Sequence, residues 1–235
     1  NVSFGVYPSE HIVTQFQAAP TVVSWLGDRF AGKFASSSCY TFAKAPKSTA
    51  KPSGGDFVVS LNDWDVGGTV DLAGLLSGLS LPAGAKLNAQ TNLTKGTLTG
   101  DISIPPFRAD LKALGLLPII VQVSITPTEP LSGSARLDND GQLHVRGKLL
   151  ANIYLNSLGN NLSIPAGCVT ETPVEFPLVF DGPVSSLGNG QLRFKGTATF
   201  PKLKDCPIDG TLEAFFSGGG QKYDFVATPP APGRW

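Results

Sequence analysis

The strongest constraint on the fold is an alternation of apolar and polar residues with a period of two, which begins near residue 57. In one segment Leu143, Val145 and Leu149 face one way, while His144 and Arg146 face the other. Antiparallel strands with one face on a core show this pattern, because successive side chains point to opposite faces of the sheet. The same alternation recurs in segments 97–104, 119–126 and 192–200. The sequence therefore predicts a mainly β protein, built as an antiparallel β-sandwich or as barrel-like sheets.

Glycine-containing turn sequences predict where strands are joined. Segments 138–141 (DNDG) and 188–190 (GNG) supply residues that tolerate positive φ, and both precede an alternating run, so we expect hairpin turns there. Segment 138–141 also begins like a calcium loop, but the glutamate that such a loop requires does not follow. Segment 66–85 departs from the alternation, and its Leu/Gly pattern predicts a short helix followed by a turn.

The N-terminal segment has helical rather than strand periodicity. Apolar residues recur at spacings of three and four, which places them on one helical face: Ile12, Phe16, Ala19, Val23, Leu26 and Phe30. Pro20 interrupts this run, so we expect either a kink or two short helices. The polar side is poor in Lys and Arg, unlike a helix that lies on a membrane surface. We therefore expect an amphipathic helix that packs on the β domain.

Composition divides the chain into three parts. Residues 1–43 hold the helical segment, and residues 44–55 are rich in Pro, Gly, Ser and Lys, as a linker or long loop is. The rest divides into a first β region, residues 56–130, and a second one, residues 131–235, with a candidate boundary at 127–136. A single continuous β domain remains the alternative.

Charge and composition narrow the class of protein. Charged residues make up 15% of the chain and hydrophobic ones 41%, with 18 basic and 18 acidic residues. Nucleic-acid binding needs a clustered positive field, which this chain lacks. Methionine is absent, as expected after removal of a signal peptide from a secreted protein.

The three cysteines predict one disulfide. Cys168 and Cys206 both lie beside prolines within one C-terminal unit, so we expect them to pair and Cys39 to be left over. A crosslink of that span contributes roughly 3–4 kcal/mol of stability. The chain has no CxxC pair and no Cys/His cluster, so we expect no zinc or other metal and no cofactor.

No catalytic constellation is recognisable. His11 and His144 are the two histidines, and neither has a Ser, Cys or acidic partner at motif spacing, so we interpret both as surface residues. Asp63 and Asp65 flank Trp64, and a hydrolase could use such a carboxylate pair. In a strand, however, both aspartates face solvent while the tryptophan faces the core. We therefore expect a protein that is not an enzyme.

The C-terminal third shows a recurring pattern. Residues 161–228 contain GCVTETPVEF, then GQLRFKGTATFPKLKDC and YDFVATPP, and residues 95–127 contain KGTLTGDISIPPF and IIVQVSITP. This pattern resembles uncharacterised secreted β-rich proteins of actinobacterial cell envelopes. The resemblance implies an exported protein located in the cell envelope, and it supports pairing of Cys168 with Cys206. It supplies no catalytic residue.

Two functions fit these features. The first is a non-catalytic secreted envelope protein that binds an apolar ligand such as a lipid or glycolipid, because strands with bulky apolar faces can enclose a cavity. We expect leucines of two segments to form its lip: Leu75, Leu76, Leu79, Leu114, Leu116 and Leu117. The alternative is a structural or adhesive cell-surface module that forms oligomers. Peripheral association with the envelope fits both functions, and neither involves nucleic acid.

Overall fold

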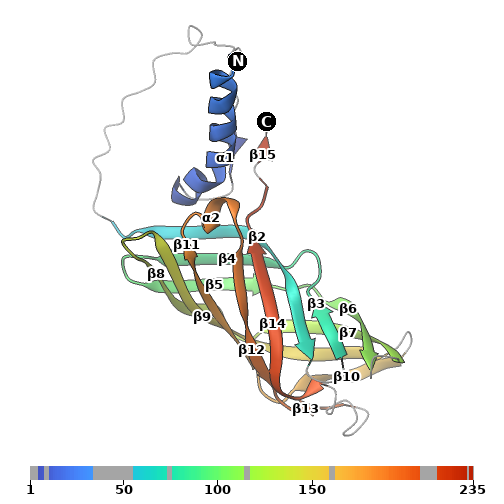
Figure 1. Cartoon of the computed structure of the whole chain (residues 1–235). Helices are drawn as coiled ribbons and strands as arrows, with labels where there is room; N and C mark the ends of the chain where they lie inside the picture. Colours follow the sequence, from blue (N-terminus) through green and yellow to red (C-terminus); the bar gives the residue numbers. More distant parts are fainter. Residues whose placement is uncertain are drawn as a thin grey trace.

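One large antiparallel sheet forms most of the molecule, and a helix stands off one end of it (Figure 1). This computed structural model describes residues 5–7, 11–33, 55–72, 76–113, 117–158, 162–206, 216–231 and 233–234. The predicted linker at 44–55 lies almost entirely outside the described residues, as does Cys39. The prediction of a mainly β, antiparallel fold with an N-terminal helix is confirmed.

The described residues form two helices and fifteen strands. The helices are α1 (His11–Phe30) and α2 (Ser186–Asn189). The first eight strands are β1 (Gly5–Val6), β2 (Val58–Leu72), β3 (Leu76–Ser80), β4 (Lys86–Asn92), β5 (Thr97–Ser103), β6 (Phe107–Ala113), β7 (Leu117–Pro127) and β8 (Leu131–Leu137). The others are β9 (Gln142–Leu158), β10 (Leu162–Thr170), β11 (Val174–Pro183), β12 (Leu192–Phe200), β13 (Leu203–Lys204), β14 (Gly218–Thr228) and β15 (Gly233–Arg234).

The main sheet joins strands from distant parts of the chain. Its path is β12-β14-β2-β4-β5-β8-β9-β10-β13, and β3, β6, β7 and β11 pair beside this path. The β14–β2 ladder connects the end of the chain to the first long strand, and the β5–β8 ladder connects residues 97–103 to residues 131–137. Residues 56–130 and 131–235 therefore contribute to one sheet and share one buried cluster.

Strand β9 is long enough to have different neighbours along its length. Its first part pairs with β8 and β11, and its second part pairs with β7 and β10. In the β8–β9 ladder Gly133 lies opposite Gly147. A Cβ at Gly133 would overlap the carbonyl of Arg146, so a glycine is required for this close approach of the two backbones.

The sheet curls around its core but is not closed into a barrel. Strands β11 and β12 lie side by side (Figure 1), yet β11 pairs with β9 and β12 with β14. A side chain of β14 reaches across β12 to β11, because the hydroxyl of Tyr223 donates to the carbonyl of Pro177. Tyr223 lies opposite Gly196 of β12, and the missing side chain there leaves room for its ring. The ring stacks on Phe225 and meets Phe176 edge-on.

Alternation along the strands produces the core as expected. Leu143, Val145 and Leu149 are buried, and His144 and Arg146 lie on the outer face. The buried residues of β12 likewise follow the predicted set: Leu192, Phe194, Ala198 and Phe200. Apolar surface removed from water contributes about 25 cal/mol per Å². Curling of the sheet is therefore stabilised, because it buries these inner faces.

The predicted short helix in segment 66–85 is wrong. Strand β2 continues to Leu72, and β3 pairs back onto it with Val70 opposite Leu79. Glycines at 74 and 78 make a helix there unfavourable, and pairing with β2 buries Leu79 instead.

The predicted hairpin turn at 188–190 is also wrong, because residues 186–189 form helix α2. The turn at 138–141 does join β8 to β9, with Gly141 at positive φ.

Helix α1 is one helix with Pro20 inside it, so the alternative of two short helices is wrong. Its first turns pack on the rest of the protein. Val13 is fully buried, and the backbone of Phe16 lies against Gly188 of α2. Figure 1 shows α2 between α1 and the sheet.

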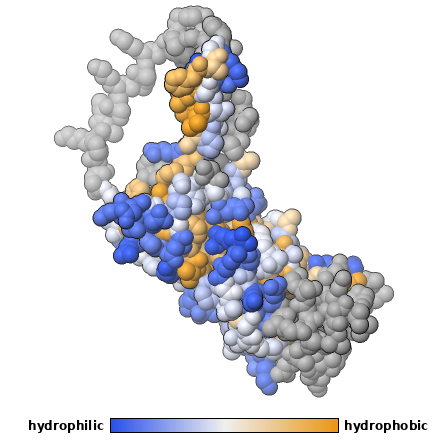
Figure 2. Space-filling view, in the orientation of Figure 1, coloured by the Kyte–Doolittle hydropathy of each residue, from blue (hydrophilic) through white to orange (hydrophobic). Residues whose placement is uncertain are grey.

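The outer half of α1 is not covered by any described residue. Val23, Leu26 and Phe30, which we expected to pack on the β domain, are 66%, 42% and 91% exposed. Hydrophobic surface on the protruding helix is visible in Figure 2. The helical period alone could not reveal this, because it shows which residues share a face but not whether a partner covers that face. In the described part of the chain, no helix is long and apolar enough to span a bilayer.

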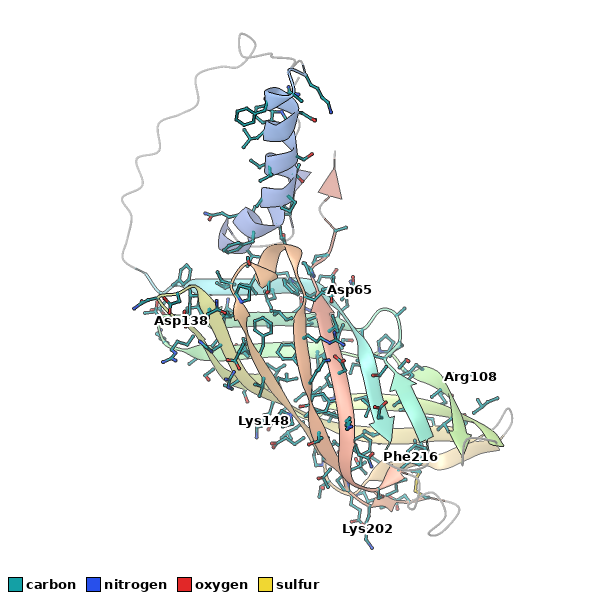
Figure 3. The ribbon with its side chains drawn as sticks, in the orientation of Figure 1. Asp65, Arg108, Asp138, Lys148, Lys202 and Phe216 are labelled. Carbon is teal, nitrogen blue, oxygen red and sulfur yellow. A yellow bond between two sulfur atoms is a disulfide. The ribbon has the colours of Figure 1, made fainter. Side chains whose placement is uncertain are left out.

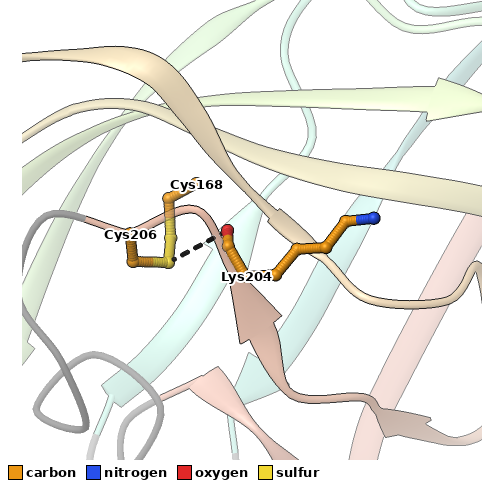
Figure 4. Close-up of a disulfide and its surroundings, with 3 residues drawn as sticks. All are labelled: Cys168, Lys204 and Cys206. Atoms are coloured by element: carbon orange, nitrogen blue, oxygen red, sulfur yellow. Dashed lines mark hydrogen bonds between the residues drawn. A yellow bond between two sulfur atoms is a disulfide. The ribbon is translucent and has the colours of Figure 1, made fainter.

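The predicted disulfide between Cys168 and Cys206 is present (Figure 4). Cys168 lies in β10 and Cys206 follows β13, and these two strands pair with Val169 opposite Lys204. The carbonyl oxygen of Lys204 lies 3.5 Å from the sulfur of Cys206, as the dashed line in Figure 4 shows. The disulfide therefore links the short edge strand β13 to β10.

Candidate functional site

Inward-facing side chains enclose an apolar cavity of about 60 Å³ inside the curled sheet. Among the described residues, eight elements and the β4–β5 turn line it, and Thr91 carries the one polar side chain of this lining. The lining residues are Val59, Leu61, Leu87, Ala89, Thr91, Leu93, Leu98, Leu131, Ala135, Leu143, Val145, Leu178, Leu187, Leu192 and Phe194. One water needs roughly 10–15 Å³ of such space, but it also needs polar partners, so this cavity stays dry.

Small residues leave the space that the cavity occupies. Ala89 of β4 and Ala135 of β8 both point inward among leucines, where a larger side chain would fill the space. Gly147 in β9 has no side chain, and Leu98 and Leu131 lie over its backbone. Bulky leucines on neighbouring strands therefore surround a region where β4, β8 and β9 contribute little volume.

Helix α2 covers one end of the cavity. Leu187 lines the cavity and is almost fully buried. A Cβ at the next residue, Gly188, would overlap Phe16, so α1 and α2 are in direct contact. The cavity is thus covered by a four-residue helix that is itself held down by the first turns of α1.

The structure describes the side chain of one of the six leucines predicted to form the lip, Leu79, and this side chain does not line the cavity. Leu79 is buried in β3, and β3 lies beside β6. Leu76 begins β3 and Leu117 begins β7. The other three lie outside the described residues: Leu75, Leu114 and Leu116. Their role in ligand binding stays a prediction.

A second hollow lies on the outer face, between the β4–β5 turn and β8, with a volume of about 490 Å³. We call it the cationic groove, because its charged lining residues are Lys95, Arg136, His144 and Arg146. Lys95 forms an ion pair with Asp56 at 2.5 Å. Within the described residues Arg136 has no ion-pair partner, although it lies opposite His144 in the β8–β9 ladder. The groove therefore holds one cationic side chain whose charge is not already paired.

His144 is held between two carboxylates. Its Nδ1 lies 2.6 Å from Asp181 and its Nε2 lies 3.2 Å from Asp138. Both ring nitrogens can donate only in the protonated imidazolium, so this geometry favours the charged form. The bond to Asp181, followed by the bond to Asp138, raises the pKa of His144 above its ordinary value. Asp138 lies near the end of the sheet closest to the helices, and Lys202 lies at the far end (Figure 3).

The carboxylates of this cluster are held ionised by their partners. Hydrogen bonds from His144 and then from Arg146 lower the pKa of Asp181. The backbone N–H of Gln142 and then His144 lower the pKa of Asp138. The guanidinium of Arg146 contacts both oxygens of Asp181, at 2.8 and 2.9 Å. The sequence predicted the outward direction of His144 and Arg146 but not these partners, because the β9–β11 pairing brings Asp181 from 37 residues away.

The cavity and the cationic groove lie beside a place where a strand ladder of the sheet ends, which we call the gap. The β5–β8 ladder ends where Leu98 pairs with Gly133, whereas β8 continues to pair with β9 as far as Leu137. Beyond Gly133 the β4–β5 turn faces β8 in place of a paired strand. Leu93 of this turn and Ala135 of β8 line both hollows.

The Asp63–Trp64–Asp65 segment lies on β2, and its side chains point as predicted. Trp64 is fully buried, while both aspartates are exposed and form ion pairs with Lys86. Asp63 has a positive φ at a bulge, and its N–H donates to the side chain of Asn88. The two carboxylates therefore share one lysine on the surface, which is the arrangement of a structural ion pair rather than of a cleft.

Comparison with protein-family models, with curated proteins and with solved structures gives no match. Among the described residues, no group of three or more His, Cys, Asp or Glu side chains is arranged to hold a metal ion. The cavity, the cationic groove and the gap between them are therefore the features on which a function can be argued.

Proposed function

We propose that this protein is a non-catalytic secreted envelope protein that binds an apolar ligand, such as a lipid or glycolipid, in the cavity of the curled sheet. The cavity is the observation that supports this function. Its lining is apolar apart from Thr91, whose hydroxyl donates to the carbonyl of Thr97. Such a lining favours hydrocarbon over water.

The energetics of an empty cavity support a ligand. Empty space in a core costs about 24 cal/mol per Å³, so a cavity of about 60 Å³ costs roughly 1–2 kcal/mol when nothing occupies it. An alkyl group placed there restores contacts with the surrounding leucines. The cavity is smaller than the ~150 Å³ space that takes up benzene in an engineered protein, so it accommodates the end of a chain.

The surroundings of the cavity favour binding over catalysis. Among the described residues that line the cavity, none carries a titratable side chain that could act as a general acid or base. The buried polar residues in the described part of the chain are Thr170 and Gln221, and neither lines the cavity. The disulfide supports an oxidising location such as the cell exterior or envelope, where such bonds persist.

Native mass spectrometry of protein purified from its natural source tests this function. We expect an added mass of lipid size that is released on unfolding. Ala89→Leu places a larger side chain in the cavity and should reduce the occupied fraction. Gln90→Leu is the matched control, because Gln90 is the next residue of β4 and points outward. A bare chain in the wild type, or equal occupancy in both variants, contradicts the proposal.

The exposed part of α1 supports a second function, a structural or adhesive module that forms oligomers. Its exposed large apolar residues are Val22, Val23, Trp25, Leu26 and Phe30. Exposed apolar surface of this kind marks sites of association. Light scattering tests it: a multimer that becomes a monomer on Leu26→Lys supports this function, and a monomer at high concentration contradicts it.

A further inference from the structure

We infer that the ligand is an amphiphile with an anionic headgroup, whose alkyl chain enters the cavity through the gap beside β8 and whose headgroup binds in the cationic groove. This inference rests on the proposed function and specifies its ligand class. It is carried by the meeting of an apolar cavity and a cationic groove at Leu93 and Ala135.

The gap is a route through the sheet. A complete strand ladder leaves no passage, because its backbones are only about 4.8 Å apart. Past the pair formed by Leu98 and Gly133, no strand of the described residues pairs with β8 on this side. The β4–β5 turn lies there instead, and the position of a Cβ on Gly96 would be 3.9 Å from the carbonyl of Ala135. Side chains rather than ladder hydrogen bonds therefore close the wall at this place.

Alternation along β9 places the two halves of the ligand site on opposite faces of the same strand. Leu143 and Val145 line the cavity, while His144 and Arg146 line the groove. An amphiphile that passes through the gap thus contacts hydrocarbon inside and cations outside. A free anion would use the groove alone, and an uncharged oil would use the cavity alone.

The charges of the groove favour an anion over a cation. Four cationic residues line it, while the acidic partners Asp56, Asp138 and Asp181 are not part of the lining. Arg136 is an exposed guanidinium without an ion pair among the described residues, and guanidinium groups bind phosphate and carboxylate through paired hydrogen bonds. The hydroxyls of Thr94 and Ser134 also line the groove and can donate to the same headgroup.

Titration calorimetry of the full chain with four compounds tests the inference. The compounds are decyl phosphate, decanol, decyltrimethylammonium and inorganic phosphate, each below its micelle concentration. The variants are Arg136→Gln, Ala89→Leu and, as a matched control, Lys148→Gln, which removes a charge from the outer face of β9 outside the groove. We expect decyl phosphate to bind most tightly and Arg136→Gln to weaken it about tenfold, as for loss of one charge-assisted bond. Decanol binding should not change in Arg136→Gln, and Lys148→Gln should alter neither compound.

The outcomes separate the two proposals. If decyl phosphate and decanol bind equally and Arg136→Gln affects neither, the headgroup site is wrong while the binding function stands. If inorganic phosphate binds as tightly as decyl phosphate and Ala89→Leu has no effect, the groove is an anion site unconnected to the cavity, and the inference is wrong. If no alkyl compound binds, the proposed function is wrong as well. Melting curves of each variant show that the fold is retained.

Discussion

The hydroxyl of Tyr223 donates to the carbonyl of Pro177 across Gly196, and so joins two strands that share no ladder. Burial raises the pKa of the Tyr223 phenol, so the group stays protonated and keeps its donor. The same ring packs on Phe176 and Phe225. This hydrogen bond, which is surrounded by aromatic side chains, thus connects β14 to β11 at the edge of the curled sheet.

Gly196→Ala should destabilise the protein by about 1–3 kcal/mol, because the new methyl group overlaps the ring of Tyr223 in a packed core. Tyr223→Phe should cost about 1 kcal/mol through loss of the hydrogen bond. Urea unfolding measures both. Gly67→Ala is the control, since no atom lies within 4 Å of the position of its Cβ. Equal stabilities for Gly196→Ala and Gly67→Ala would show that the ring does not need this space.

Removal of the disulfide should lower the free energy of unfolding by about 3–4 kcal/mol, because the bond closes a loop of this length in the unfolded chain. The double variant Cys168→Ala/Cys206→Ala and the reduced wild type should unfold at the same denaturant concentration. Peptide mapping without reductant should recover residues 168 and 206 in one linked pair. A linkage through Cys39 would contradict the pairing.

His144 should make stability depend on pH. Its pKa is raised in the folded state by Asp181 and Asp138, so its contribution is present below about 6.5, the unfolded value, and is lost as the pH rises through the folded pKa. The pKa values of both aspartates are lowered, so their contribution is lost only as the pH falls through those lowered values. The melting temperature of the wild type should therefore exceed that of His144→Gln more at pH 5.5 than at pH 8.5.

Lys148→Gln is the control for this measurement, because Lys148 lies on the same face of β9 and pairs with Glu129 rather than with Asp138 or Asp181. If the melting temperatures of the wild type and His144→Gln differ by the same amount at both pH values, the two carboxylates do not stabilise the imidazolium.

Gly188→Ala should release α1 from α2. The added methyl group overlaps the backbone of Phe16, which cannot move unless the helix shifts. Hydrogen exchange of amides in the first turns of α1 should become faster, while the amides of β9 and β11 keep their protection. Gly27→Ala, in the exposed part of the same helix, has no atom within 4 Å of the new Cβ and should change neither. Unchanged exchange in Gly188→Ala would argue against direct contact of the two helices.

The sequence indicates which residues of a strand face the apolar interior, but it does not show which of them line the cavity. Alternation along β9 shows that Leu143 and Val145 face inward, and this follows from the strand period alone. Which other leucines meet them depends on strand order, and the cavity gathers residues from Val59 to Phe194. A local leucine-rich pattern predicts a lip at Leu79, but the structure places that residue in β3, where it does not line the cavity.

Local chemistry along the chain was enough to specify the strands in segments 97–104, 119–126 and 192–200, the inward and outward faces of residues such as Trp64, the helical period of α1 and the turn at 138–141. These features depend on backbone geometry and on neighbours a few residues apart. Tertiary packing decided the pairing of β9 with β11, the contact between Tyr223 and Pro177 and the exposure of Phe30. Each of these depends on surfaces that distant segments present to one another, and a period within one segment carries no information about them.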